Sequence, residues 1–467
     1  MVVVALIFAA AALTWGLVYA PRLSMLAACS AMAALGYVCG PPMWSPKVGP
    51  VTLTCDRVLL AGVIALAAWQ WRQGQLHWRR PLAADWLVLA LVGYLTIRTG
   101  LTPAAEGVRS SVGPWWRLLA SFWIPAVLYA LGRSATLNAR NWRSAMTVLV
   151  ALGAYLSLTA VAEITKQWWA VFPRYIADPT VGTHFGRARG PAVMSASLGV
   201  YLTYTFWAAW LLWPSAGRAA RAVLTGLLGA MAFGVLLTFT RSTWIGLAGG
   251  LAVIPLLQLP RQWRMPAAIA GGIAAVAGGL ILAGAVEDIK RKDSDGSAEH
   301  SVYQRASFAI VSMRMFRDAP IVGHGFGRFY DKKLPYLADR SQQLELDSIR
   351  QLDHHNTLLS ILTETGLIGL GLFLCTLAAW ARGAWTLAAS DAAPTWVRRH
   401  GLFAIGVLIA YLGSALFHDL TLSPTEHWIL FFAAGVTAGL LAERFPARAT
   451  NLAPARALSA GRLVAAP

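Results

Sequence analysis

Charged residues are scarce in this chain. Asp, Glu, Lys and Arg make up only 13% of its 467 residues, and 57% of the residues are hydrophobic. Soluble proteins carry about 25% charged residues, so a soluble globular fold is excluded. Twenty-one tryptophans fit rings placed at membrane–water interfaces. The composition therefore predicts an all-α polytopic membrane protein.

Cysteine is also rare. The four cysteines are Cys29, Cys39, Cys55 and Cys375. Their spacing matches no metal pattern, and we interpret them as small packing residues rather than a disulfide framework or metal site. Asp353, His354 and His355 are adjacent, and side chains on consecutive residues rarely chelate one ion well. The sequence thus predicts neither a metal nor another cofactor.

Long hydrophobic runs are what the chain has in abundance. A spanning helix needs about 20 mostly apolar residues, and thirteen runs are candidates. They are 2–20, 23–40, 57–71, 85–98, 116–132, 145–164, 191–213, 221–239, 242–259, 265–286, 356–380, 401–418 and 427–443. Because 57–71 and 85–98 are short, we expect about 12–13 transmembrane helices. The first run lacks the basic segment of a cleaved signal peptide, so we expect it to be a spanning helix.

The basic residues are distributed unevenly. Cytoplasmic loops carry an excess of Lys and Arg. If the long loop 287–355 lies outside and the runs alternate, the inside loops hold 18 of the 39 basic residues but 3 of the 21 acidic ones. Nearly all of the net charge of +18 is then cytoplasmic. Topology alone accounts for the basic chain, and no nucleic-acid partner is needed.

This topology divides the chain into four parts. They are an N-terminal transmembrane bundle at 1–286 with a short outer loop at 165–190, a large outer loop at 287–355, C-terminal transmembrane helices at 356–443 and a cytoplasmic tail at 444–467. A connector as long as the large outer loop is usually functional.

Within the large outer loop, two segments have a clear local pattern. Apolar residues recur at helical spacing in 303–318, which predicts a helix lying along the membrane face. The glycines of 320–327 predict a tight turn rather than a phosphate-binding loop, because no strand and helix flank them.

Three outer arginines are candidates for anion binding. Arg187 and Arg189 stand just before a span, and Arg241 lies between two apolar runs with almost no loop. An arginine so near hydrocarbon is costly and needs a partner or a purpose. One interpretation is snorkelling to lipid headgroups. The other is a site in which guanidinium groups, each a planar fork of donors, converge on a pyrophosphate.

His355 is the candidate proton acceptor. It stands at the end of the large outer loop, where the chain enters an apolar helix. An unperturbed histidine has a pKa near 6.5, so this side chain can take a proton from an attacking hydroxyl. A lone loop histidine is otherwise a structural residue, and the adjacent His354 is easily confused with it.

Four motifs in register resemble a known family. They are Arg187-Ala188-Arg189-Gly190, Thr240-Arg241-Ser242, Arg305 followed by the glycine-rich Pro320–Phe329, and His355-Asn356 followed by Glu364, Gly366 and Gly369. Their order over about residues 180–380 is similar to that of the O-antigen ligase / O-antigen polymerase superfamily. The chain departs from the family pattern at Pro191–Ser197, where the family often shows an Asn-Pro-Asn-like element, and this leaves the choice between Arg187 and Arg189 open.

The resemblance implies a GT-C-like enzyme of the bacterial inner membrane whose large periplasmic loop covers the active site. Such enzymes move a glycan from undecaprenyl pyrophosphate to an acceptor hydroxyl without a nucleotide sugar or a metal. It also implies roles for particular residues. Arg241, with Arg187 or Arg189 and Arg305, would bind the pyrophosphate; His355 would be the general base; Asn356, His354 and Glu364 would support it.

Several alternatives remain at this stage. The acceptor is a lipid A core sugar in a ligase, which we favour, a second lipid-linked glycan in a polymerase, or a protein Ser or Thr in an O-oligosaccharyltransferase. A lipid-linked-glycan transporter is a rival from another class, although charged residues near the midplane of the spans would then be expected. A purely structural membrane protein would not need His355-Asn356 beside Arg241.

Overall fold

The computed structural model describes residues 23–48, 51–102, 113–260, 262–271, 297–338 and 345–443. Its larger helices are α2 (Met25–Val38), α3 (Cys55–Arg72), α4 (Ala83–Leu101), α6 (Ile124–Ser134), α7 (Ala139–Ile164), α8 (Ser195–Leu212), α9 (Arg218–Leu237), α10 (Arg241–Gln258), α12 (Ser297–Asp318), α14 (Thr357–Ala389), α15 (Thr395–Ala415) and α16 (Thr425–Ala442). Short helices are α5 (Pro114–Leu118), which a π-helical turn at Leu119–Trp123 joins to α6, and α13 (Phe329–Lys332). In the described residues, strand structure is limited to a two-stranded hairpin, β1 (Lys47–Val48) and β2 (Val51–Thr52).

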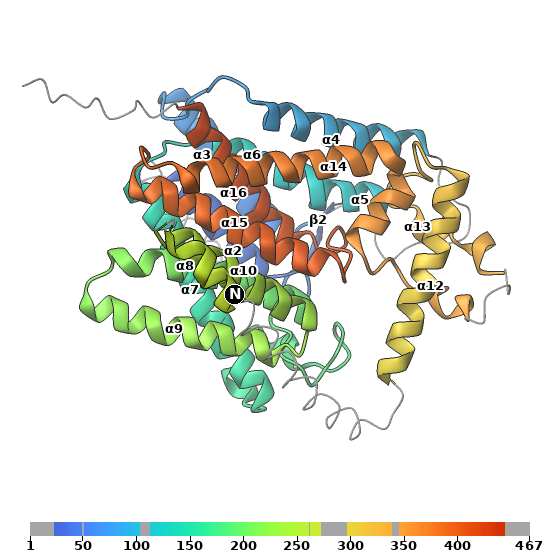
Figure 1. The fold of residues 1–467 in the computed structure, drawn as a ribbon. Coiled ribbons are helices and arrows are strands. Elements are labelled where there is room, and N and C mark those ends of the chain that lie inside the picture. Colours follow the sequence, from blue (N-terminus) through green and yellow to red (C-terminus); the bar gives the residue numbers. More distant parts are fainter. Residues whose placement is uncertain are drawn as a thin grey trace, which may run out of the picture.

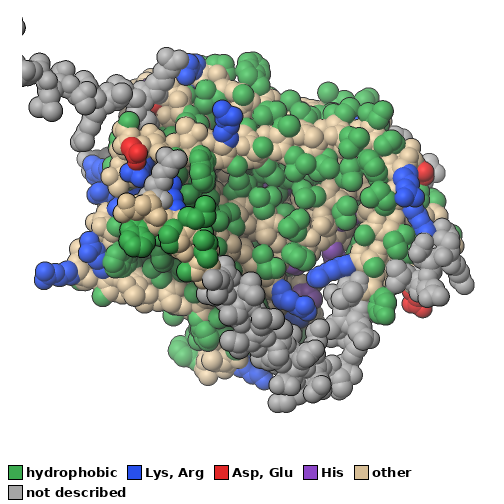
Figure 2. All heavy atoms as spheres, viewed as in Figure 1, with side chains coloured by type: hydrophobic (Ala, Val, Ile, Leu, Met, Phe, Trp, Pro, Cys, Tyr) green, Lys and Arg blue, Asp and Glu red, His purple; other side chains and the backbone are tan. Residues whose placement is uncertain are grey.

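The predicted all-α membrane class is confirmed. Among the residues that the structure describes, five helices (α4, α7, α9, α14 and α16) are long and apolar enough to cross a membrane. Figure 1 shows the long helices packed into one bundle, with α12 standing apart from it at one end. Apolar side chains cover much of the bundle's visible face in Figure 2, as expected where lipid replaces water.

The centre of the bundle is α16. Its apolar window is 83% buried, against 22% for α4 and 17% for α9. Small residues let its backbone approach α6 closely: a Cβ on Gly435 would lie 2.1 Å from the Tyr129 carbonyl oxygen, and one on Gly132 would lie 2.9 Å from that of Phe432. Close approach through small residues is the usual way that helices pack in membranes.

The two shortest predicted spans are helices in the structure. Runs 57–71 and 85–98 lie within α3 and α4. The run 2–20 and most of 265–286 lie outside the described residues. The total of 12–13 spanning helices therefore stays a prediction.

The predicted cytoplasmic residues meet at one end of the bundle. Arg79 pairs with Glu443, and Arg133 Nε lies 2.6 Å from Asp85 Oδ1. Each pair joins two segments that the charge pattern assigns to the same side of the membrane. The grouping supports the alternation of the spans, while the side on which this end lies stays a prediction.

The large outer loop has a small core of its own. The α12 residues Phe308, Val311 and Met315 are buried together with Phe329 and Leu337, among others. The helix expected at 303–318 is therefore confirmed, but the expectation that its apolar face lies along the membrane is wrong. Later segments of the same loop fold back and cover that face, a contact that periodicity does not reveal.

Candidate functional site

The start of α14 fixes the position of His355. Asn356 is the N-cap of this helix: its side chain accepts a hydrogen bond from the Leu359 N–H at 2.9 Å and donates one to the Leu416 carbonyl at 2.7 Å. An Asn at this position satisfies a backbone donor that the helix cannot satisfy itself. Asn356 thus ties the helix start to the segment that follows α15, one residue after His355.

The two adjacent histidines have different environments. His354 is buried, with Nδ1 accepting from the Asn356 N–H at 3.1 Å and Nε2 lying 2.7 Å from Ser312 Oγ. Because Nδ1 accepts, Nε2 carries the proton and donates it to Ser312. Burial lowers the pKa of His354 to about 3. His354 is therefore a neutral residue that joins α12 to the end of the loop.

His355 is exposed instead, with its ring 4.9 Å from that of Phe308. Partial desolvation of the ring, together with the neighbouring Arg305 charge, lowers the pKa of His355 below its ordinary 6.5. The imidazole is thus neutral at pH 7 and able to accept a proton.

Cationic side chains from separate segments lie around His355. Arg305 belongs to α12, and its guanidinium carbon lies 5.7 Å from the Phe417 ring centre. Arg187 Nη1 lies 3.5 Å from the Phe239 carbonyl oxygen, two residues before Arg241. Burial and the charges of Arg187 and His355 lower the pKa of His184, which places the 165–190 loop near the end of the large loop. Figure 2 shows Lys or Arg side chains and His side chains gathered beside a hollow in this face.

Backbone strain marks the same region. His184 and Phe239 have φ angles of 56° and 48°, a left-handed conformation that is costly for residues other than glycine. Each precedes one of the arginines by two or three residues. Such strain tends to occur at functional sites, where the surrounding structure holds it in place.

The structure separates the two arginines of the 165–190 loop. Arg189 is 1% exposed, and its guanidinium donates to the carbonyls of Val181, Ile176 and Asp178 at 2.8–3.1 Å. Arg189 therefore stabilises the conformation of this loop, and few of its N–H donors remain available to a ligand. Arg187 is exposed and is the member of the pair whose guanidinium is open to a ligand.

A buried arginine that the sequence analysis missed links three segments. Arg117 of α5 donates to Glu364 Oε1 at 2.9 Å, to Asp419 Oδ2 at 2.8 Å and to Ser360 Oγ at 2.9 Å. All three charged side chains are nearly inaccessible to solvent. In the sequence, Arg117 is visible as a charged residue near the start of the apolar run 116–132. Its acidic partners, Glu364 and Asp419, are more than 240 residues away along the chain.

Glu364 therefore anchors the site rather than facing it. Besides its ion pair, it accepts backbone hydrogen bonds from Gly327 and Phe329 at 3.0 and 3.1 Å. It joins α5, α14 and the glycine-rich segment of the large loop. No solvent reaches its carboxylate, so we assign it to support and not to reaction.

The glycine-rich segment Pro320–Gly327 docks into a break in α14. Gly366 has non-helical angles (φ 66°, ψ −165°), which free backbone groups that a membrane helix must satisfy. The segment supplies the partners: His324 N–H donates to Thr363 O at 3.0 Å, and Leu367 N–H donates to Pro320 O at 2.9 Å. The expected tight turn is confirmed by positive φ angles at three glycines. They are Gly323, Gly325 and Gly327.

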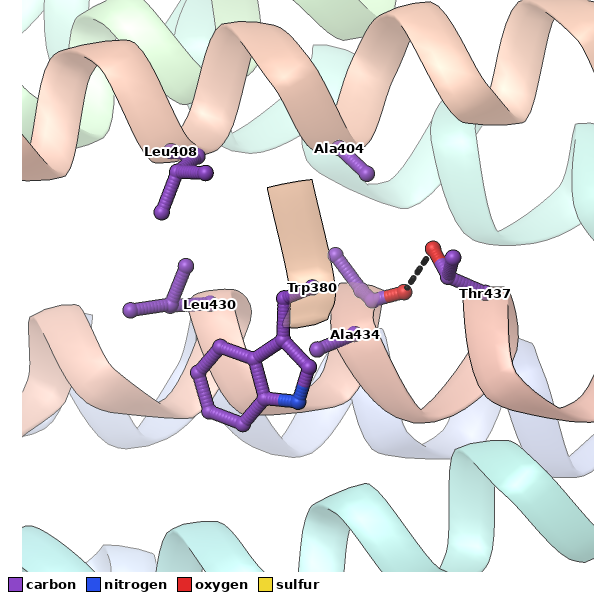
Figure 3. Close-up of a pocket in the computed structure, with 7 residues that line it drawn as sticks. Trp380, Ala404, Leu408, Leu430, Ala434 and Thr437 are labelled. Atoms are coloured by element: carbon purple, nitrogen blue, oxygen red, sulfur yellow. Dashed lines mark hydrogen bonds between the residues drawn. The ribbon is translucent and has the colours of Figure 1, made fainter. Parts of the chain in front are cut away.

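The cavity found between helices inside the bundle is too small for a glycan. Figure 3 shows a gap between α14, α15 and α16 beside Trp380, where Thr437 donates to the Ala433 carbonyl at 2.9 Å. Its volume of about 10 Å³ suits roughly one water. In the described ranges, no group of three or more His, Cys, Asp or Glu is placed to hold a metal. The outer hollow is the better candidate for the substrate.

Two comparisons show which known proteins the chain is similar to. Residues 226–374 match the family described as O-Antigen ligase; this segment includes Arg241, Arg305, His355 and Glu364. The chain is also 27% identical, over 296 residues, to the exopolysaccharide production protein ExoQ of Rhizobium meliloti (strain 1021). That match covers 60% of this chain and 64% of ExoQ, a little less than two thirds of the relative. Both matches support a similarity of this chain to the O-antigen ligase / O-antigen polymerase superfamily.

Proposed function

We propose that this protein transfers a glycan from undecaprenyl pyrophosphate to an acceptor hydroxyl at the periplasmic face of the bacterial inner membrane. The observation that carries the proposal is an exposed, neutral His355 near the charge of Arg305, with two more exposed arginines on segments that contact each other or the residues after α15. The arginines are Arg187, Arg241 and Arg305. All but Arg187 lie within the segment that matches the family.

In the proposed reaction, His355 removes the proton from the acceptor hydroxyl as its oxygen attacks the anomeric carbon of the glycan. The bond between that carbon and the pyrophosphate oxygen breaks, and undecaprenyl pyrophosphate leaves with the electron pair. Negative charge grows on the leaving group, and the arginines stabilise it by charge-assisted hydrogen bonds. The proton on His355 then passes to solvent.

Three guanidinium groups supply the positive charge that a metal ion supplies in many sugar transferases. We therefore propose a metal-independent reaction. Chelation of divalent ions by EDTA is expected to leave the transfer rate unchanged.

The acceptor has two candidates. The family description favours a ligase, in which a lipid A core sugar carries the hydroxyl. The similarity to an exopolysaccharide production protein favours a polymerase, in which a second lipid-linked glycan carries it. Both use the same donor and the same base.

A transfer assay tests the proposal. The full chain in nanodiscs receives an undecaprenyl-pyrophosphate glycan with lipid A core or with a second lipid-linked glycan, with and without EDTA. Product on lipid A core establishes a ligase, and ladders on the lipid carrier establish a polymerase. Failure with both acceptors would contradict ligase and polymerase activity and favour protein glycosylation or transport.

A further inference from the structure

A third histidine lies at this site and has no part in the reaction described above. His418 is half-buried in the segment after α15. Its Nδ1 lies 3.4 Å from Ser242 Oγ, and Ser242 follows Arg241 at the start of α10. The preceding residue, Phe417, lies under the Arg305 guanidinium. Each neighbour of His418 in these contacts thus links it to one of the arginines that we assign to the pyrophosphate: Ser242 follows Arg241, and Phe417 contacts Arg305.

The backbone holds His418 rigidly. Its N–H donates to the Ser414 carbonyl at 2.9 Å, and its carbonyl accepts from Thr357 Oγ1 at 2.8 Å. Thr357 is the first residue of α14, two residues after His355. The two histidines thus keep a fixed relation, unlike the long and exposed arginine side chains, which lose conformational freedom when they bind.

The surroundings of His418 suit an anion. Burial, together with the charges of His355, Arg305 and His184, lowers its pKa to about 4. The ring is therefore neutral at pH 7, and it lies near Arg305, which is cationic, and near two histidines that can become protonated. A neutral imidazole has one donor nitrogen and one acceptor nitrogen. If the Ser242 hydroxyl donates to Nδ1, Nε2 carries the proton and is free to donate to a ligand.

We propose that His418 binds the diphosphate of the lipid-linked donor through its Nε2–H, with Ser242 fixing this tautomer. The inference rests on the proposed function, because it takes the same donor. His418 is a binding residue in this scheme, and His355 remains the only base. Its loss should raise KM for the donor, whereas loss of His355 should lower kcat.

The test is binding of undecaprenyl pyrophosphate, without glycan, to the full chain in nanodiscs. His418→Ala should weaken binding on the order of tenfold, as expected for loss of one hydrogen bond to a charged group. His418→Asn, whose amide can still donate, should recover most of the affinity, and Ser242→Ala should fall between the two. His77→Ala is the matched control, because His77 is exposed at the opposite end of the bundle.

The outcomes separate the two proposals. If the wild-type chain does not bind the lipid, the proposed function and this inference both fail. If the wild-type chain binds and His418→Ala binds equally well, only this inference fails. If His418→Ala unfolds, the comparison is made with His418→Asn and Ser242→Ala. A loss of binding in His418→Asn as large as the tenfold loss expected for His418→Ala, together with unchanged binding in Ser242→Ala, overturns the donor role.

Discussion

At the scale of single residues, similar side chains differ because of what surrounds them. His354 and His355 are neighbours, yet one is buried between Ser312 and a backbone N–H and the other is exposed. Arg187 and Arg189 differ in the same way, since three carbonyls occupy the Arg189 guanidinium. Residue type therefore indicates which chemistry a side chain can perform. Burial decides which of two like residues is accessible enough to perform it.

Replacing each histidine of the pair should give opposite results. His355→Ala is expected to lower the transfer rate by about 10²–10⁴-fold, the usual contribution of a general base, with an unchanged unfolding midpoint. His354→Ala removes two buried hydrogen bonds and should cost about 1–3 kcal/mol of stability. The transfer assay and thermal unfolding in detergent measure the two effects. Full activity in His355→Ala would reject its assignment as the base.

The pH dependence of transfer should report the pKa of His355. The pKa of His355 is lowered from 6.5, so as the pH rises the ring already loses its extra proton at a pH below 6.5. We therefore expect kcat/KM to rise with pH through an acid limb and to level off by neutral pH. Arg305→Gln removes a positive neighbour, which raises the pKa of His355 and moves the limb to higher pH. An acid limb that stays in place in this variant would show that the two side chains are not coupled.

At the scale of elements, the contact between the glycine-rich segment and α14 is decisive. A helix broken at Gly366 would leave backbone groups unpaired, and the segment Pro320–Gly327 pairs them. The approach is so close that a Cβ on Gly366 would lie 2.3 Å from the Ile321 carbonyl oxygen. The large loop and the helix that follows His355 are thus one unit.

Gly366→Ala should therefore undock this segment. The added methyl meets backbone, and the positive φ is unfavourable for alanine, so we expect a lower unfolding temperature and loss of transfer. Gly371→Ala on the same helix is the matched control, since a Cβ there meets nothing within 4 Å. Proteolysis of the loop and thermal unfolding compare the two variants. Equal behaviour would contradict the docking role.

At the scale of the whole molecule, the buried ion cluster holds distant parts together. Arg117 connects α5 with α14 and with the segment after α15. A charge in such a place is costly unless it is paired and hydrogen-bonded. The cluster lies beneath the segments that carry His355 and His418, so it sets their relative position.

Arg117→Met should destabilise the protein by about 3–5 kcal/mol, because two buried carboxylates lose their partner. Arg350→Met removes an ion pair at the surface, where the Arg350 and Asp347 side chains are 53% and 65% exposed, and should have no measurable effect. Unfolding of both variants in the same detergent gives the comparison. A small loss in Arg117→Met would mean that the cluster does not link the segments energetically.

The membrane class, the helical architecture and most element positions could be predicted from the sequence, because hydrophobic run length and local motifs are properties of neighbouring residues. The sequence did not reveal Arg117, the covered face of α12, the docking of Pro320–Gly327 at Gly366 or the difference between Arg187 and Arg189. Each of these depends on contacts between segments far apart along the chain. Only the tertiary structure decides which polar groups are buried and paired and which stay open to a substrate.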